Sequence, residues 1–150
     1  MRVYELQRSQ VVPRPIDEVF PFFAAAANLE AITPPWLRFR MVTPEPVEMH
    51  AGTLIEYRLR VHGIPMHWTS RIDEWDPPHR FLDCQLRGPY RLWEHLHVLE
   101  PHPQGTLSRD HVRYALPLGP LGALANALLV RRDLERIFDH RREATIRLLG

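Results

Sequence analysis

Two histidines, His95 and His97, stand two residues apart in a segment that alternates as a β-strand does. Side chains two apart on a strand point to the same face, so the two imidazoles point the same way. With a third ligand such as Asp110, such a pair forms the facial triad that binds a divalent metal. No third ligand follows at a diagnostic spacing, and we expect neither a metal nor another cofactor. The histidines then either line a ligand pocket or form hydrogen bonds on the outer face of a sheet.

Asp110 is the next candidate, because alternation in residues 106–116 places it on the more apolar face of its strand. A carboxylate buried on such a face needs partners that compensate its charge. Arg141 is a matching exception, since it falls on the apolar stripe of the predicted C-terminal helix. It forms a structural ion pair with Asp83 or Asp110, extends its charged end to solvent, or anchors an anionic group of a ligand.

Other kinds of chemistry find little support in the sequence. Cys84 is the only cysteine, which excludes an intramolecular disulfide and a thiolate zinc cluster. No serine stands in a Gly-x-Ser-x-Gly motif, and no glycine-rich loop of the kind that cradles phosphate is present. Nucleophilic catalysis is therefore not expected.

Composition indicates one globular domain. Of 150 residues, 45% are hydrophobic and 25% charged, which suits a packed core and argues against disorder. Nineteen basic residues, all of them arginine, balance eighteen acidic ones, and a net charge of +1 gives no field that would attract nucleic acid. No run approaches the roughly 18–20 apolar residues that cross a bilayer, and no secretory signal is visible. We expect a cytoplasmic protein that binds no nucleic acid and has no stable membrane insertion.

Apolar residues recur with two different periods along the chain. A period of two predicts strands at 3–12, near 37–41, and at 53–61, 66–72, 81–86, 90–99 and 106–116. A period of about 3.6 predicts two short helices, 15–24 and 24–32, and a helix of nearly thirty residues after residues 117–120. The prediction is an α+β fold in one domain, residues 1–150. A curved antiparallel sheet of about six to seven strands surrounds a long C-terminal helix, with two short helices after strand 1.

Five segments form a recognisable set. They are Pro15-Ile16-Asp17-Glu18-Val19-Phe20, Leu29-Glu30-Ala31-Ile32-Thr33-Pro34-Pro35-Trp36-Leu37, Gly88-Pro89-Tyr90-x-x-Trp93-x-His95-x-His97, Asp110-x-Val112-x-Tyr114 and Ile137-Phe138-x-x-Arg141. With the order of the elements, they resemble the SRPBCC superfamily, whose helix-grip fold is shared by START lipid-transfer domains, birch-pollen-type allergens and polyketide cyclases. The resemblance spans essentially the whole chain. The combination of segments is most similar to a bacterial subgroup of small stand-alone proteins. Members of this subgroup also occur as domains attached to sugar-nucleotide-epimerase-like chains.

The resemblance implies a deep, largely apolar tunnel between the sheet and the long helix, which binds a small hydrophobic or amphipathic molecule. The residue pattern agrees with this. The apolar walls would be Trp68, Trp93, Tyr114, Leu134 and Phe138. The polar groups that orient a ligand would be Asp83, Gln85, His95, His97, Asp110 and Arg141. Because both faces of 90–99 are apolar, alternation does not show which of them points inward.

Three functions are compatible with these residues. The first is a carrier or sensor without catalysis, since no acid–base pair stands at a spacing that names a reaction. The second is a cyclase- or dehydratase-like enzyme in which His95 or His97, polarised by Asp83 or Asp110, removes a proton next to a carbonyl. The third is an interaction module whose cavity is vestigial. The charge pattern does not choose between a monomer and a homodimer.

Overall fold

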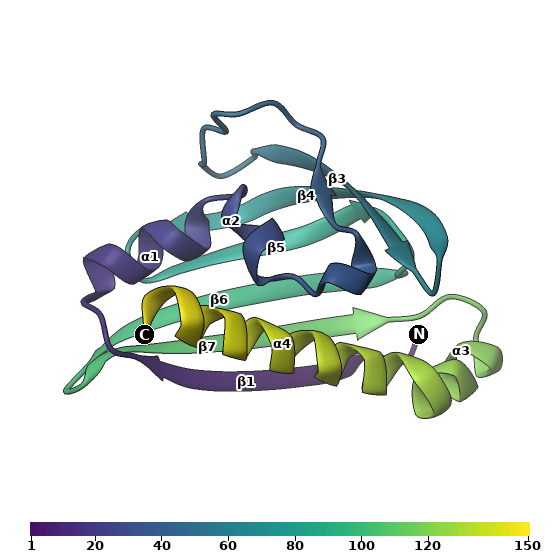
Figure 1. The fold of residues 1–150 in the computed structure, drawn as a ribbon. Helices are drawn as coiled ribbons and strands as arrows, with labels where there is room; N and C mark the ends of the chain where they lie inside the picture. Colours follow the sequence, from purple (N-terminus) through teal and green to yellow (C-terminus); the bar gives the residue numbers. More distant parts are fainter.

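Seven strands form one antiparallel sheet in the order β1-β7-β6-β5-β4-β3-β2 (Figure 1). The computed structural model of the protein describes residues 1–150. The strands are β1 (Tyr4–Val12), β2 (Arg40–Met41), β3 (Leu54–Val61), β4 (Ile64–Asp76), β5 (Arg80–Arg87), β6 (Leu92–His102) and β7 (Gly105–Ala115). The helices are α1 (Ile16–Ala24), α2 (Asn28–Ile32), the 3₁₀ turn η1 (Pro35–Leu37), α3 (Pro120–Ala125), the π-helical turn η2 (Asn126–Val130) and α4 (Arg131–Leu149). The predicted fold class is confirmed.

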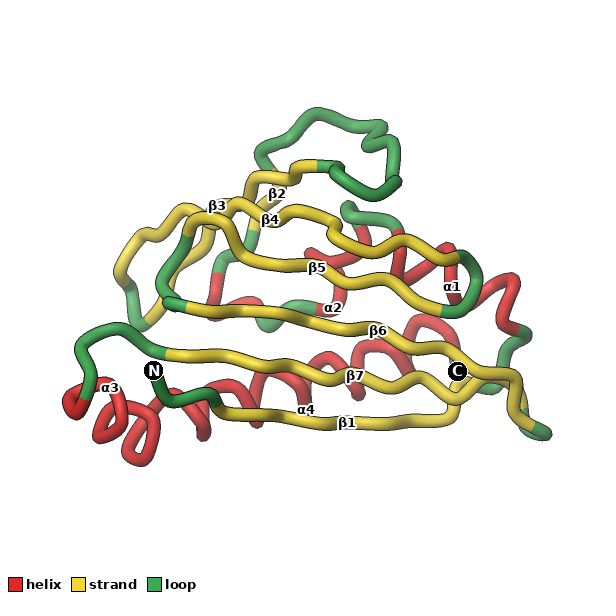
Figure 2. Tube along the Cα trace, turned by 180° about the vertical axis from the view of Figure 1, so that it is seen from behind, coloured by secondary structure: helices red, strands yellow, loops and turns green.

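One face of the sheet carries the main helices. Figure 1 shows α4 passing in front of the strands with α1 and α2 beside it, and Figure 2, from the opposite side, shows the strands in front of these helices. The pairing of β4 with β5 shifts register near Ser70 and near Ile72. Such bulges bend a strand, so they contribute to the curvature of the sheet around the helices.

Strand β6 decides which face of the sheet points inward. Trp93, His95, His97 and Leu99 are all buried, whereas the alternate side chains are partly exposed. Glu94 on the outer face accepts a hydrogen bond from Arg113 of β7 at 2.9 Å. The histidine face is therefore the inner one, which alternation alone left open.

Buried apolar side chains gather in two main clusters. One lies where α4 packs on β1, β6 and β7, and it consists of Leu6, Trp93, Val112, Tyr114, Leu134 and Phe138. The other lies beneath α1, and it consists of Val12, Val19, Phe20, Ala24, Phe81 and Leu99. One cluster thus holds α4 on the sheet and the other holds α1. A cavity can form in the space between the two clusters.

The C-terminal helix extends from Pro120 to Leu149 with one π-helical turn in it, as long as the sequence predicts. At this turn, the buried hydroxyl of Tyr114 donates a hydrogen bond of 2.6 Å to Oδ1 of Asn126. The bond ties the helix to β7. No helix is both long and apolar enough to cross a membrane.

The region near residues 37–41 differs from the predicted strand. Only Arg40 and Met41 pair with β3, because residues 35–37 form the 3₁₀ turn η1 instead. Pro35 has a fixed φ that suits the first residue of such a turn. Arg38 then takes a left-handed conformation, with φ of 45°, which turns the chain toward β2.

Replacing Tyr114 by Phe should lower the free energy of unfolding by about 1–3 kcal/mol, because the buried amide oxygen of Asn126 loses its donor. Urea denaturation measures the change. Tyr4→Phe is the matched control, since Tyr4 stacks on Tyr114 but its hydroxyl forms no hydrogen bond. Equal stability of the Tyr114→Phe variant and the wild type would show that this bond does not hold the helix.

Candidate functional site

A cavity of about 700 Å³ lies between the inner face of the sheet and the helices. Of the 35 residues that line it, 24 are hydrophobic. Its volume and composition are those of pockets that hold small organic molecules. Trp68 and Trp93 meet edge to face at 5.3 Å along one wall, and Phe138 of α4 lies on the opposite wall.

A buried polar cluster stands against this apolar lining. Strands β5, β6 and β7 are neighbours, and their register pairs Asp83 with His95 and His97 with Asp110. Arg141 of α4 reaches the same point from the helix, with Nη2 at 3.3 Å from Oδ1 of Asp110. Five residues from four elements thus form one network, because sheet register and the helix face bring them together.

His97 uses both of its ring nitrogens inside this network. Nε2 donates to Oδ2 of Asp83 at 2.7 Å, and Nδ1 accepts from Nη2 of Arg141 at 3.4 Å. The ring is stacked between Phe81 at 4.0 Å and His95 at 3.7 Å. Burial, together with the neighbouring His95, lowers the pKa of His97 from 6.5 to about 4. The imidazole is therefore neutral and held by its partners.

His95 uses only one nitrogen in the network. Its Nε2 lies 2.7 Å from Oδ1 of Asp110, and an ionised carboxylate can only accept, so Nε2 carries the proton. Nδ1 has no hydrogen-bond partner, whereas every fully buried polar side-chain atom of the protein has one. Because His95 lines the cavity, Nδ1 is available to a ligand as a hydrogen-bond acceptor.

The two carboxylates stay charged in spite of their burial. Burial alone would raise the pKa of Asp110, but the Arg141 guanidinium and the hydrogen bond from His95 hold it well below its usual range. Burial likewise opposes the charge of Asp83, and the hydrogen bond from His97 with nearby positive charge keeps its pKa below the usual range. Arg141 thus forms the ion pair with Asp110 that was one of the interpretations of its position.

The histidine pair is poorly arranged for a metal. Asp83, His95 and His97 each offer one ligand atom, all within 4.8 Å of one another. The two imidazoles, however, are stacked at 3.7 Å with an angle of 25° between their planes, and an in-plane lone pair of one ring converges poorly on an ion that lies in the plane of the other. The guanidinium of Arg141, 3.4 Å from His97, adds repulsion toward a cation.

Seven of the ten predicted binding residues line the cavity: Trp68, Asp83, Trp93, His95, His97, Phe138 and Arg141. Gln85, Asp110 and Tyr114 are not among the residues that line it. Gln85 donates to the backbone carbonyl of Tyr90 at 2.7 Å and accepts from its N–H at 3.1 Å, so it fixes the turn before β6. Asp110 lies behind His95, and Tyr114 is bonded to Asn126.

Several polar residues at the cavity are not among the predicted site residues, and four of them are His62, Asp133, Tyr57 and Tyr90. His62, in the turn between β3 and β4, is bonded to Asp133 of α4 through Nε2 and Oδ2 at 2.6 Å. This contact joins strands to helix at one end of the cavity. Tyr57 and Tyr90 have hydroxyls without a protein partner, and burial raises their pKa values, so both remain donors. Alternation placed Tyr57 on an apolar face, but only tertiary packing brings His62 to Asp133.

A curved sheet that grips a long C-terminal helix over an apolar cavity defines the helix-grip class of proteins. The family model for "Polyketide cyclase / dehydrase and lipid transport" matches residues 4–147, and the chain belongs to this family, within the SRPBCC superfamily. No curated protein sequence matches the chain.

Several solved structures have the same fold. The di-domain ARO/CYC StfQ of the steffimycin biosynthetic pathway superposes with a TM-score of 0.76 at 13% identity, over 98% of this chain and 50% of that one. Ara h 8.0201 gives 0.66 at 14% identity, over 99% and 98%. The nucleoside-diphosphate sugar epimerase from Corynebacterium glutamicum gives 0.71 at 22% identity, over 95% of this chain and 28% of that one. At these identities the likeness shows the fold alone.

Stability should fall as the pH drops from 6.5 to about 4, because the unfolded chain protonates His97 in this window and the folded protein does not. The unfolded state then binds more protons, which costs up to about 3 kcal/mol of the free energy of unfolding. The lowered pKa values of Asp83 and Asp110 act below this window.

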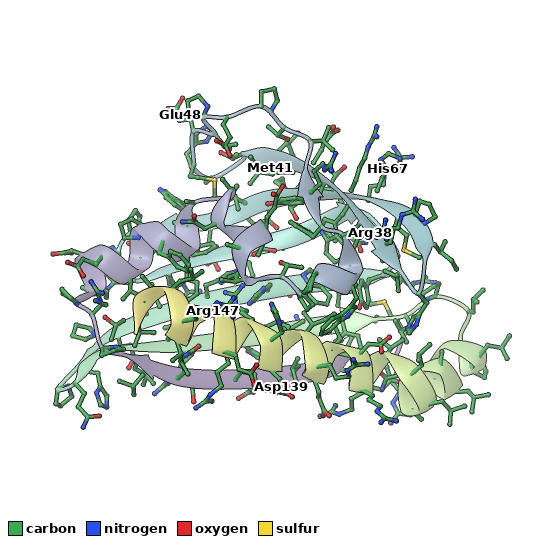
Figure 3. The ribbon with its side chains drawn as sticks, viewed as in Figure 1. Arg38, Met41, Glu48, His67, Asp139 and Arg147 are labelled. Carbon is green, nitrogen blue, oxygen red and sulfur yellow. The ribbon has the colours of Figure 1, made fainter.

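Urea denaturation across this pH range measures the slope for the wild type and for His97→Gln, which should flatten it. His67→Gln is the control, since this exposed histidine of β4 projects away from the sheet (Figure 3). If the free energy of unfolding of His97→Gln depends on pH as steeply as that of the wild type, other groups cause the pH dependence.

Proposed function

We propose that the protein binds a small hydrophobic or amphipathic molecule in the cavity between the sheet and the C-terminal helix, as a carrier or sensor. The observation that carries this proposal is the cavity of about 700 Å³ itself, with its mainly apolar lining. A hollow of this size in a core costs packing energy, since interiors are otherwise filled to crystal-like density. A ligand that fills it would recover those contacts.

The polar groups that face the cavity suggest how such a ligand is oriented. His95 offers an acceptor at Nδ1, while the hydroxyls of Tyr57 and Tyr90 can donate. Arg141 already pairs with Asp110, which weakens its interpretation as an anchor for an anionic group. The arrangement favours a ligand with an apolar body and a hydroxyl or carbonyl group.

Native mass spectrometry of the purified protein should show a bound small molecule, or uptake of one equivalent of an added long-chain alcohol. Ile137→Trp places a large ring at the cavity and should weaken uptake at least roughly tenfold, because the apolar contact area is taken. Ile146→Trp is the matched control on an exposed part of the same helix. No bound species in the wild type, or equal uptake by both variants, would contradict binding in this cavity.

A second candidate function is proton abstraction next to a carbonyl group, as in a cyclase- or dehydratase-like enzyme. The observation that favours it is the hydrogen bond between Nε2 of His95 and Asp110, which leaves Nδ1 of this cavity-lining residue without a protein partner. A carboxylate that binds one ring nitrogen in this way fixes the tautomer and the orientation of the imidazole. His97 is less suited, since both of its nitrogens are bonded.

Proton abstraction is measured by the exchange of the α-protons of a small aromatic β-keto ester in D₂O, followed by NMR. The wild type should accelerate exchange, and His95→Gln should reduce the acceleration on the order of 100-fold, the usual contribution of a general base. Asp110→Asn should lower the rate and shift its pH profile. If the wild type accelerates exchange no more than His95→Gln does, the enzymatic candidate is wrong, and ligand binding is the only function that stands.

A further inference from the structure

The beginning of the C-terminal helix presents an apolar surface to solvent. From Tyr114 to Val130 the chain has no charged residue. Within this stretch five leucines are exposed, between 44% and 72%: Leu118, Leu121, Leu124, Leu128 and Leu129. We call these residues the leucine segment. Large apolar side chains gathered at the surface in this way mark an interaction site.

The leucine segment contributes little to the core of the protein. In Figures 1 and 2, α3 extends beyond the end of the sheet, and of its residues only Gly122 is buried. The side chains that pack on the sheet come later on the same helix, at Leu134, Phe138 and Ala144. The exposed leucines are therefore not explained by the fold.

The leucine segment lies beside one end of the cavity. His62 and Gly63 in the turn between β3 and β4, and Val130 at the end of the π-helical turn, all line the cavity. The bond from His62 to Asp133 holds that turn against the start of α4. Ile64, next to the turn, is 60% exposed and adds apolar surface at the same end.

Arginines follow the leucine segment directly. Arg131 and Arg132 are both exposed. Arg131 lies 3.5 Å from Glu135, whereas Arg132 forms no ion pair. The carboxylate of Asp133, the next residue in the sequence, is already engaged by His62. An apolar helical surface with cationic side chains at its border is typical of helices that lie on an anionic bilayer.

We propose that the leucine segment docks on the surface of a bilayer that contains anionic lipids and brings the adjacent end of the cavity to the membrane. The five leucines, four of them on α3 and η2 and Leu118 just before α3, are far fewer than the roughly 20 residues that each side of a stable protein interface contributes. A bilayer surface, in contrast, accepts a shallow apolar face and a few arginines. The contact is peripheral and does not depend on which molecule the cavity binds.

Vesicle flotation with the full chain tests this proposal, with phosphatidylcholine alone and with an equal mixture of phosphatidylcholine and phosphatidylglycerol. The wild type should float with the mixed vesicles. Leu121→Ser/Leu128→Ser should weaken binding at least about tenfold, because apolar area is lost. Arg131→Gln/Arg132→Gln should also weaken it on the order of tenfold, and high salt should mimic this variant. Leu54→Ser is the control, a leucine 54% exposed on β3.

Flotation of the wild type with neither vesicle would overturn the proposal. So would an effect of Leu54→Ser as large as that of the double leucine variant. A dimer in light scattering that only Leu121→Ser/Leu128→Ser dissociates, without vesicle binding, would assign the segment to a second copy of the chain and also overturn it. Uptake of a long-chain alcohol by the leucine variant should equal that of the wild type, so docking and cavity binding can fail separately.

Discussion

The position of the C-terminal helix depends on the compensation of one largely buried carboxylate, that of Asp110, whose side chain is 14% exposed. Its position on the inner face of β7 would be strongly unfavourable without partners. His95 from the neighbouring strand and Arg141 from the facing helix supply them, at 2.7 and 3.3 Å. These contacts join β6, β7 and α4, so the group that needs compensation also fixes where the helix lies on the sheet. The same contacts set the tautomer of His95 and leave its other nitrogen without a protein partner.

The cavity stays open because the aromatic side chains of its wall pack against one another. Trp68, Tyr90 and Trp93 pack together with ring centroids between 4.8 and 5.7 Å apart, and this aromatic group spans β4, the turn before β6, and β6. Gln85 holds that turn through two hydrogen bonds to Tyr90. Large rings that rest on one another cannot move into the hollow without losing these contacts. The interior is thus apolar and yet unfilled.

Alternation and helical periodicity were sufficient for the fold outside residues 37–41, because they depend on neighbours in the sequence. The inner face of β6 was not predictable from them, since Leu92, Leu96 and Val98 make its outer face equally apolar. Asp110 was correctly placed on the inner side of β7, but periodicity cannot show that His95 covers it. Tyr114 also points inward, and its hydroxyl belongs to Asn126 because the π-helical turn brings that amide to it. How deep each side chain lies behind the cavity wall is a tertiary property, which periodicity does not report.

His95 and His97 show why spacing alone did not separate structure from chemistry. They share a strand, a face and a residue type, and each donates to a buried aspartate. His97 is enclosed by Phe81, Asp83 and Arg141, so its role is to neutralise and pack. His95 likewise donates a hydrogen bond to Asp110 and compensates its charge. A histidine–aspartate pair is therefore explained by charge compensation alone. The feature that compensation does not require is the free nitrogen of His95 at the cavity, and both the orientation of a ligand and any proton transfer would act through that atom.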